Sequence, residues 1–331
     1  NWLVSALAVG SAVVLYDGSP FQPDNERLLD LIDDERISVF GTSPKFLAAL
    51  ESNGVKPRES HDLSSLKTLL CTGSALAPRS YDFVYRDVKP DVCLSSMSGG
   101  TDIVSCFVNG NPMSPVRRGE MMGKSLGMAV EVWNDAGQAV IGEKGELVCT
   151  RHFPAMPIGL WNDPDGEKLR QSYFNLFPGT WAQGDYAEEL PHGAMLIHGR
   201  SDAVLNPGGV RIGTAEIYRQ VEKIPQVIDS VAIGQQWQDD VRVVLFVHLK
   251  DGIELDEPLQ QQIRQVIRAN TTPRHVPAKI VEVSDIPRTI SGKVVELAVR
   301  NVVHGDTVKN TDALANPQAL EQYRDRPELK D

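Results

Sequence analysis

The sequence predicts an α/β protein: a mostly parallel sheet with helices and an antiparallel β subdomain, followed by a small mobile α+β domain. Three observations predict it. Strand and helix patterns alternate through the first hundred residues, as in a parallel sheet covered by helices. From Met128 to about His198, short β-type runs are separated by turn-forming clusters. After a segment rich in Gly and Arg, helix and strand patterns mix over a length that suits a second domain.

The helices and strands of the first part are predicted from the spacing of apolar residues and from the residues that flank each element. Pro44 suits the first turn of a helix after Ser43, for example, because a proline there loses no helical hydrogen bond. We expect a helix after Pro23, a strand at 37–40, a helix from Pro44, a strand at 66–71, a helix at 78–87 and a strand at 91–94. Ligands of such a sheet collect at the carboxyl ends of its strands, so those ends are the places to search.

The remaining elements are predicted in the same way. The β subdomain is expected to hold strands at 129–133, 145–149 and 194–198. The last domain is expected to hold a helix at 214–223, strands at 227–233 and 241–249, a helix at 259–270, a strand at 279–283 and a helix at 294–303. Residues 306–331 are polar and contain two prolines, so we expect a tail that wraps the surface or stays mobile.

The charge balance restricts the partners. The chain has 33 Lys and Arg against 44 Asp and Glu, a formal net charge of −11. Such a surface repels nucleic acid and anionic membranes, so we expect neither as a partner. A local basic cleft can still hold the phosphates of a small ligand.

Cysteine use and the opening apolar run indicate a cytoplasmic protein. The widely spaced Cys71, Cys93, Cys106 and Cys149 lie in or beside apolar runs, which favours buried free thiols over disulfides or metal ligands. The run from Trp2 to Tyr16 lacks a basic flank and is shorter than the ~20 residues of a membrane span, so we interpret it as core. Because the sequence opens abruptly inside this run, we expect a longer protein of which this is the carboxyl-terminal portion.

The segment from His198 to Ile217 is interpreted as a joint between domains. It holds Arg200, Asp202 and Arg211 among several glycines, and a helical pattern begins near its end. Charged and conformationally special residues at such a boundary can contact a ligand and also set how two bodies move. A plain surface loop has the same composition, so composition alone leaves both interpretations open.

Four further segments place polar side chains at predicted strand ends. Thr72–Ala75 suits close approach to a purine, or is a plain strand-to-helix turn. Ser95–Asp102 ends in a hydroxyl and a carboxylate, the oxygen ligands that Mg²⁺ prefers. Asp185 suits a ribose diol or caps a turn, and Lys293 is either functional or an ordinary surface lysine.

The order and spacing of these motifs resemble the adenylate-forming superfamily of acyl-CoA synthetases, luciferases and peptide-synthetase adenylation domains. The resemblance covers essentially the whole chain and rests on Thr72-Gly73-Ser74, Gly99-Gly100-Thr101-Asp102, Gly145-Glu146-Leu147, Gly184-Asp185, Gly199-Arg200-Ser201-Asp202 with Gly209 and Arg211, and Ser291-Gly292-Lys293. Four segments are similar to the members that activate acetoacetate: Asn1–Ser5, Val14–Gly18, Ser98–Asp102 and Ala315–Tyr323. The family's Ser/Thr-Ser-Gly-Thr-Thr-Gly-x-Pro-Lys phosphate loop is absent from this sequence.

The resemblance implies an AMP-forming acid–thiol ligase with acetoacetate, ATP and CoA as small-molecule substrates and Mg²⁺ as the metal. It implies nucleotide contacts by Gly73, Ser74 and Ala75 (adenine), Asp185 (ribose), Arg200 (ribose or α-phosphate), Arg211 (phosphates), and Thr101 and Asp102 (phosphate and Mg²⁺). It assigns adenylate formation to Lys293 and a hinge to Asp202, and it assigns the CoA tunnel to Gly208 and Gly209.

The acyl pocket is expected at Ser98 and Gly99. Gly99 stands where acetate-activating relatives have a tryptophan, so the pocket is expected to be deep enough for acetoacetate, with Ser98 or a backbone amide bonded to its ketone. The alternative is that Gly99 only permits a tight turn.

The resemblance also implies the domain boundaries. Residues 1–199 are expected to be the carboxyl-terminal part of the large AMP-binding domain, with 128–199 its β-rich subdomain. Residues 200–202 are the expected hinge, 203–305 the small carboxyl-terminal domain and 306–331 the surface tail. Three alternatives stay open: activation of another short-chain acid, loading of a carrier-protein thiol instead of CoA, and an inactive piece that lacks the phosphate loop.

Overall fold

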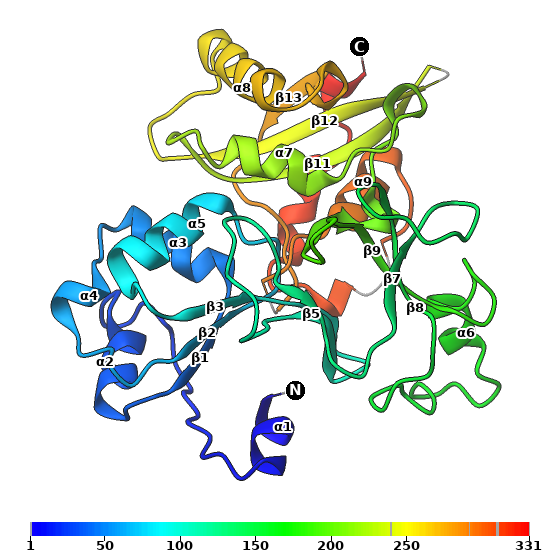
Figure 1. The fold of residues 1–331 in the computed structure, drawn as a ribbon. Helices are drawn as coiled ribbons and strands as arrows, with labels where there is room; N and C mark the ends of the chain where they lie inside the picture. The colour runs from blue at the N-terminus through cyan, green and yellow to red at the C-terminus, as the bar shows by residue number, and fades with distance from the viewer. Residues whose placement is uncertain (1, 239, 291, 309–310, 331) are drawn as a thin grey trace. The chain divides into compact units, whose positions relative to one another are not determined.

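The computed structural model describes residues 2–238, 240–290, 292–308 and 311–330, which form two compact units (Figure 1). The first unit comprises Asn1–Gln183 with Ala187–Leu196. The second comprises Gly184–Tyr186 with Ile197–Asp331. Each unit has its own core and is described by itself.

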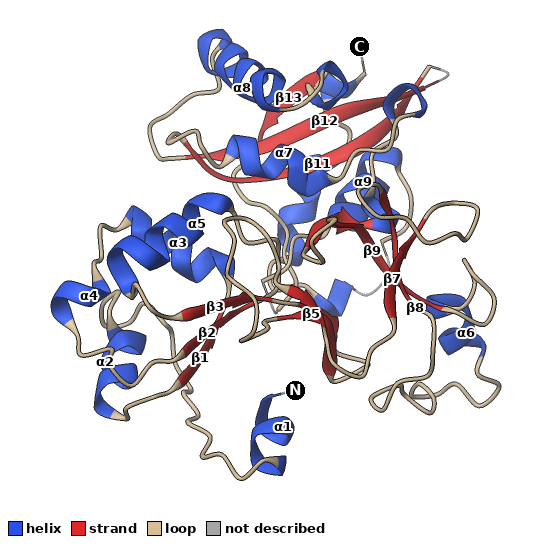
Figure 2. Cartoon of the chain, in the orientation of Figure 1, coloured by secondary structure: helices blue, strands red, loops and turns tan. Residues whose placement is uncertain are grey.

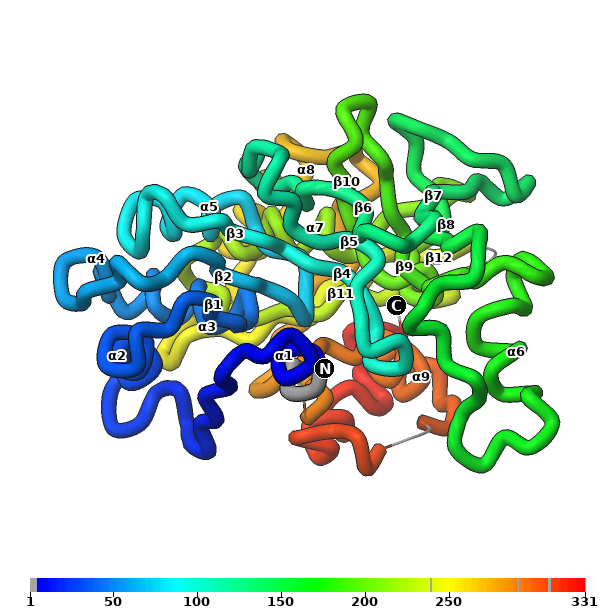
Figure 3. The backbone as a smooth tube through the Cα atoms, turned by 60° about the horizontal axis from the view of Figure 1, so that its bottom comes forward, coloured from blue at the N-terminus to red at the C-terminus, as the bar shows by residue number. Residues whose placement is uncertain are grey.

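A parallel sheet organises the first part of the amino-terminal unit. Strands β1 (Val39–Thr42), β2 (Thr68–Cys71) and β3 (Cys93–Ser96) pair in that order, in parallel, as Figure 3 shows from below. The predicted parallel sheet is therefore confirmed, although each strand begins two residues later than the sequence pattern places it, and β1 and β3 also end two residues later. The shift puts Ser95 and Ser96, nearly fully buried, inside β3.

Helices cover this sheet and bury one apolar cluster against it. They are α2 (Arg27–Asp34), α3 (Pro44–Ser52), α4 (Pro57–Ser60) and α5 (Pro78–Phe83), the last continuing as a π-helical segment, Val84–Val88. As predicted, Pro44 opens α3, and the Ser43 hydroxyl caps it by accepting a hydrogen bond from the Phe46 amide at 3.3 Å. Leu29, Leu47 and Leu69 are almost fully buried in the shared core.

Two further sheets complete the amino-terminal part of the fold (Figure 2). One contains β4 (Ser98–Gly100), β5 (Ser105–Asn109) and β6 (Gly123–Lys124), with antiparallel pairing that the sequence analysis did not predict. The other contains β7 (Val130–Trp133), β8 (Lys144–Cys149), β9 (Trp181–Glu189) and β10 (Met195–Arg200), in the order β10-β9-β8-β7. Helix α6 (Glu167–Tyr173) precedes β9 in the chain. Strands β7 and β8 pair antiparallel, as expected of the β subdomain.

The interpretation of Trp2–Tyr16 as core is wrong for this structure. The run forms α1 (Trp2–Ala8) and an extended segment, and several of its described apolar side chains are exposed, among them Leu7 by 65%, Val9 by 79% and Leu15 by 74%. An apolar composition indicates that burial of the segment would be favourable, but it does not show which surface buries it.

The carboxyl-terminal unit is built on a three-stranded sheet with two apolar faces. Strands β11 (Val227–Trp237) and β12 (Asp240–Leu249) pair antiparallel, and β13 (Lys279–Glu282) pairs parallel to β12. Side chains alternate between the faces. One face packs on α7 (Thr214–Val221) and α8 (Glu257–Asn270), and the other packs on α9 (Glu296–His304). All six predicted elements of this domain are present.

The tail after α9 packs into the second of these cores. It forms three short 3-10 helices, Thr311–Ala313, Pro317–Tyr323 and Pro327–Leu329. Tyr323 is fully buried, and Leu320 and Leu329 are each 5% exposed. The expected surface tail is thus anchored through apolar side chains that its polar composition conceals.

Candidate active site

The carboxyl ends of β2 and β3 bring two predicted motifs together. The Thr72 hydroxyl donates to the Met97 carbonyl at 3.0 Å, and the Met97 amide donates to the Cys71 carbonyl at 2.9 Å. Gly73, which follows β2, is exposed and has a φ of +106°, a conformation that favours glycine. Ser74 is exposed and Ala75 half-buried, so this turn presents its backbone at the sheet edge where ligands of parallel sheets bind.

The Ser98–Asp102 segment runs from β4 into an exposed turn. Thr101 and Asp102 are exposed, and the Tyr173 hydroxyl donates to Asp102 Oδ2 at 2.5 Å. The Tyr173 ring stacks on Trp181, with ring centres 3.8 Å apart and an angle of 14° between planes. Sequence reasoning missed this pair, because Tyr173 lies 71 residues from Asp102 and in no motif.

The oxygen donors of this turn fit a cation held mostly by phosphates and water. Mg²⁺ in nucleotide sites commonly takes only one or two protein oxygens. Within the described ranges, no group of three or more His, Cys, Asp or Glu side chains forms a metal cage. Asp102 and Thr101 therefore suit a nucleotide-bound Mg²⁺ better than a permanent metal centre.

Gly99 is surrounded by backbone. It pairs with Cys106 beside an irregularity in the β4–β5 register. A Cβ atom at this position would lie 2.6 Å from Cys106 Cα and closer still to the Ser105 carbonyl oxygen. The Gln183 side chain also donates to the Gly99 carbonyl at 3.3 Å. Close backbone packing is thus sufficient to explain the glycine.

Asp185 and Arg200, predicted to contact the nucleotide, are paired. Arg200 Nη1 donates to Asp185 Oδ1 at 3.1 Å, and the Asp185 carboxylate is buried while the guanidinium is half exposed. Gly184, with a φ of +79°, leaves room for the guanidinium, which a Cβ atom there would meet. The alternative that Asp185 caps a turn is wrong, since Trp181, Gly184 and Asp185 all belong to β9. Consecutive residues of β9 are buried, so the sequence lacks the alternation of apolar and polar residues that would have predicted this strand.

The joint after β10 is a short, braced loop. Arg200 Nε lies 3.7 Å from Asp202 Oδ1, and Asp202 lies in a 3-10 turn, Ser201–Ala203. Gly208 and Gly209 have φ values of +57° and +76°.

Two side chains from elsewhere in the unit hold the glycine turn. Asp240 accepts a hydrogen bond from the Gly208 amide at 2.9 Å. Arg274 Nη1 donates to the carbonyls of Pro207 and Gly208, at 3.0 Å each. Arg211 is exposed on the same loop, which a bridge between Leu205 and Ile212 closes.

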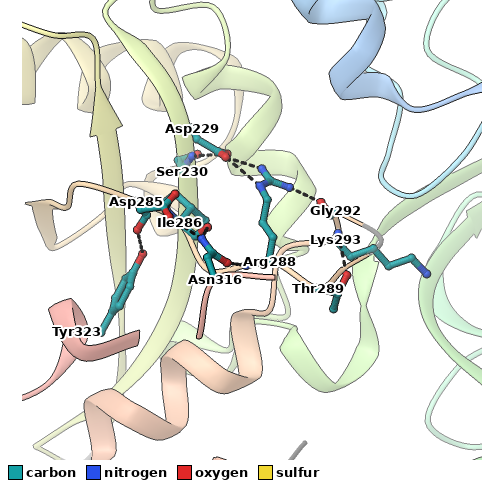
Figure 4. A network of polar contacts seen from close by, with 10 residues as sticks. All are labelled: Asp229, Ser230, Asp285, Ile286, Arg288, Thr289, Gly292, Lys293, Asn316 and Tyr323. Carbon is teal, nitrogen blue, oxygen red and sulfur yellow. Dashed lines mark hydrogen bonds and ion pairs between the residues drawn. The ribbon is translucent and has the colours of Figure 1, made fainter. Parts of the chain in front are cut away.

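Lys293 is exposed at the end of a tight loop before α9 (Figure 4). The Thr289 amide donates to the Lys293 carbonyl at 2.9 Å, and the Lys293 amide donates to the Thr289 hydroxyl at 3.0 Å. Gly292 has a φ of +82°, and its amide donates to the Thr289 carbonyl at 2.8 Å. Ser291 of the predicted motif lies outside the described residues. The loop therefore fixes the backbone of Lys293 and leaves its side chain exposed.

The cysteines offer no activated nucleophile at this edge. All four are free, with Cys71 and Cys149 buried and the other two partly buried. Burial raises the pKa of the Cys71 thiol to about 12, although Cys71 directly precedes the Thr72 turn. A thiol in such surroundings stays protonated and unreactive, which agrees with the predicted structural role.

Residues 1–156 match the family described as AMP-binding enzyme, and residues 219–293 match the AMP-binding enzyme C-terminal domain. Both matches are to the AMP-binding enzyme family, over 156 and 75 of the 331 residues. It is 61% identical, over its full length, to acetoacetyl-coenzyme A synthetase of Rhizobium meliloti (strain 1021), and 48% identical to the Xenopus tropicalis acetoacetyl-CoA synthetase. The chain spans about half the length of these curated relatives, 51% and 49%.

The fold agrees with this family. The chain superposes on acetoacetyl-CoA synthetase from Streptomyces lividans with a TM-score of 0.91 and 38% sequence identity, over 97% of this chain and 50% of that one. The predicted α/β class, with parallel and antiparallel sheets, is thereby confirmed. No described helix combines the length and apolarity needed to cross a bilayer.

Proposed function

We propose that the full-length protein carrying this sequence is an acetoacetate–CoA ligase. In the first step the acetoacetate carboxylate attacks the α-phosphorus of ATP, giving acetoacetyl-adenylate and pyrophosphate. In the second, the CoA thiol loses its proton and attacks the acyl carbon, giving acetoacetyl-CoA and AMP. The observation that carries the proposal is 61% identity to an acetoacetyl-CoA synthetase over the whole chain.

The nucleotide is proposed to contact the two amino-terminal motifs and the Asp185–Arg200 pair. Gly73, Ser74 and Ala75 would contact adenine through the exposed turn. Asp185, whose Oδ1 accepts a hydrogen bond from Arg200, would bind the ribose diol through its carboxylate. Arg200 and Arg211 would contact phosphates, and Thr101 and Asp102 would hold a bound Mg²⁺, whose charge offsets that of the phosphates.

Lys293 is proposed to serve adenylate formation. Its ammonium would hold the carboxylate and the developing negative charge at the α-phosphate, which lowers the barrier by positioning and charge stabilisation. We further propose a hinge at Asp202, between residues 1–199 and the small domain 203–305. Rotation there would exchange Lys293 for the braced Gly208–Gly209 turn, which lacks side chains and would line the pantetheine tunnel.

Ser98 is proposed to select the acyl group by a hydrogen bond to the ketone oxygen. A site built to bond a polar group rejects an analogue lacking that group more strongly than an apolar pocket rejects an extra methylene. A drop in the acetoacetate-to-butyrate ratio of kcat/KM in Ser98→Ala would support this assignment.

The decisive test separates the two half-reactions in the full-length protein. Lys293→Ala should lower ATP–pyrophosphate exchange with acetoacetate by about 10²–10³ and should largely spare thioester formation from pre-made acetoacetyl-adenylate. Lys250→Ala, at an exposed lysine after β12, is the matched control and should leave both rates unchanged. Equal losses in both half-reactions would contradict the role of Lys293. AMP release that needs a carrier protein rather than CoA would contradict the proposed acceptor.

A further inference from the structure

The first part of the loop that carries Lys293, Arg288 to Ile290, is paired with the tail after α9. Thr289 and Leu314 form an antiparallel bridge. The Ile290 amide donates to the Ala313 carbonyl at 3.0 Å, and the Ala315 amide donates to the Arg288 carbonyl at 2.8 Å. The backbone leading to Lys293 is therefore bonded to a segment that follows it by about twenty residues.

Asn316 extends this pairing with all parts of its side-chain amide. Its Nδ2 donates to Asp285 Oδ2 at 2.6 Å and to the Ile286 carbonyl at 3.0 Å. Its Oδ1 accepts from the Arg288 amide at 2.8 Å. One half-buried side chain thus satisfies three groups of the short segment 285–288, directly before the loop.

Arg288 joins the loop to the central sheet (Figure 4). Its Nε and Nη2 donate to Asp229 Oδ2 on β11, at 3.1 and 2.5 Å, and its Nη1 donates to the Gly292 carbonyl at 2.6 Å. The guanidinium is planar, so one rigid group connects the sheet to the residue immediately before Lys293. Both charged side chains are less than a fifth exposed, which makes this pair less screened than a surface ion pair.

The tail can act as a support because it is itself anchored. The Tyr323 ring packs edge-on against Phe246 of β12 with centres 4.7 Å apart. The Tyr323 hydroxyl donates to the Asp285 carbonyl at 3.0 Å. Tyr323 and Asn316 therefore both bond the segment 285–288, and Tyr323 anchors the tail in the core.

We infer that Asn316 and Arg288 are positioning residues that fix the backbone of the Lys293 loop for adenylate formation. A lysine has a long, flexible side chain, so the place of its ammonium depends on how firmly its backbone is held. A displacement of about 1 Å at a positioned group can cost about 10²-fold in rate. The inference rests on the proposed role of Lys293, and it predicts that loosening the clamp impairs the same half-reaction as removing the lysine.

The test compares Asn316→Ala with Asn270→Ala. Asn270 lies on the exposed end of α8 in the same unit, where its Nδ2 donates only locally, to the Val266 carbonyl at 2.8 Å. In the full-length protein, Asn316→Ala should lower ATP–pyrophosphate exchange by about 10–100-fold through kcat, and should leave thioester formation from pre-made acetoacetyl-adenylate within about twofold. Asn270→Ala should change neither rate.

Limited trypsin digestion of the 331-residue chain gives a readout that does not depend on activity. Peptide mapping should show cleavage after Lys293 accelerated in Asn316→Ala and unchanged in Asn270→Ala, with cleavage after Lys250 equal in both. Arg288→Lys keeps the charge but loses the planar fork, so it should accelerate the same cut. Unchanged cleavage after Lys293 overturns the inference.

A loosened loop with unchanged pyrophosphate exchange also overturns the inference. If Lys293→Ala is then fully active as well, the failure is that of the proposed function. If Lys293→Ala is inactive, the failure belongs to the positioning role alone.

Discussion

Replacing Gly99 by alanine tests whether backbone packing or the acyl pocket requires glycine at this position. A methyl group at Gly99 would stand 2.6 Å from Cys106 Cα and closer to the Ser105 carbonyl oxygen. Ordinary carbon–carbon contacts lie near 3.5–4.0 Å, so the β4 and β5 backbones must separate by about 1 Å. Both obstructing groups are main chain, and neither can rotate away as a long side chain would.

The expected cost follows from this overlap. Overpacking that forces backbone to move typically costs about 1–3 kcal/mol. Gly→Ala also restricts the unfolded chain, which stabilises by about 0.4–1 kcal/mol where the new side chain meets nothing. Gly159 provides that control, because a Cβ atom there has no neighbour within 4 Å and its φ is not positive. We expect Gly99→Ala to be less stable than Gly159→Ala by about 2 kcal/mol or more.

Urea unfolding followed by tryptophan fluorescence measures the difference. Trp181 is 1% exposed, and its ring centre lies 6.4 Å from that of Phe107 on β5, so its emission reports on this region. With an m value of about 2 kcal/mol/M, the Gly99→Ala midpoint should fall about 1 M urea below that of Gly159→Ala. Coincident midpoints would refute the packing argument, and the deep-pocket explanation for Gly99 would then stand alone.

Two further predictions concern the carboxyl-terminal unit and the joint. Burial raises the pKa of the Glu296 carboxyl, whose Oε1 accepts hydrogen bonds from the Thr214 and Tyr218 hydroxyls at 3.3 and 3.1 Å. Above about pH 4.5 the folded state therefore binds more protons than the unfolded state. The free energy of unfolding then falls as pH rises through the raised pKa. Glu296→Gln should therefore melt at a higher temperature than wild type at pH 8, and a melting-temperature gap that fails to narrow toward pH 4 would contradict the sign. Asp202→Pro restricts φ to about −65° and should impair the two half-reactions unequally in the full-length protein, whereas wild-type rates in both would exclude a hinge there.

The sequence predicted most elements because their signals are local. The Ser43 cap of α3, the prolines that open α3 and α5, and the apolar periods of α7 and α8 act within a few residues, so period and flanking residues suffice. Strand β9 escaped prediction because it is buried on consecutive positions, and β4 escaped because three residues carry too little pattern. Element ends moved by a few residues for the same reason, since pairing partners set where a strand stops.

The sequence by itself determined the α/β class, the two-part organisation and the motifs that are proposed to contact a nucleotide, because residue type and spacing encode these. Only the tertiary structure decided which side chains meet: Tyr173 on Asp102, Arg200 on Asp185, and Asn316 and Arg288 on the Lys293 loop. It also decided that the polar tail is anchored and that Gly99 faces backbone. The physical reason is that hydrogen bonds and packing act over a few ångströms in space, between residues whose separation along the chain has no fixed relation to that distance.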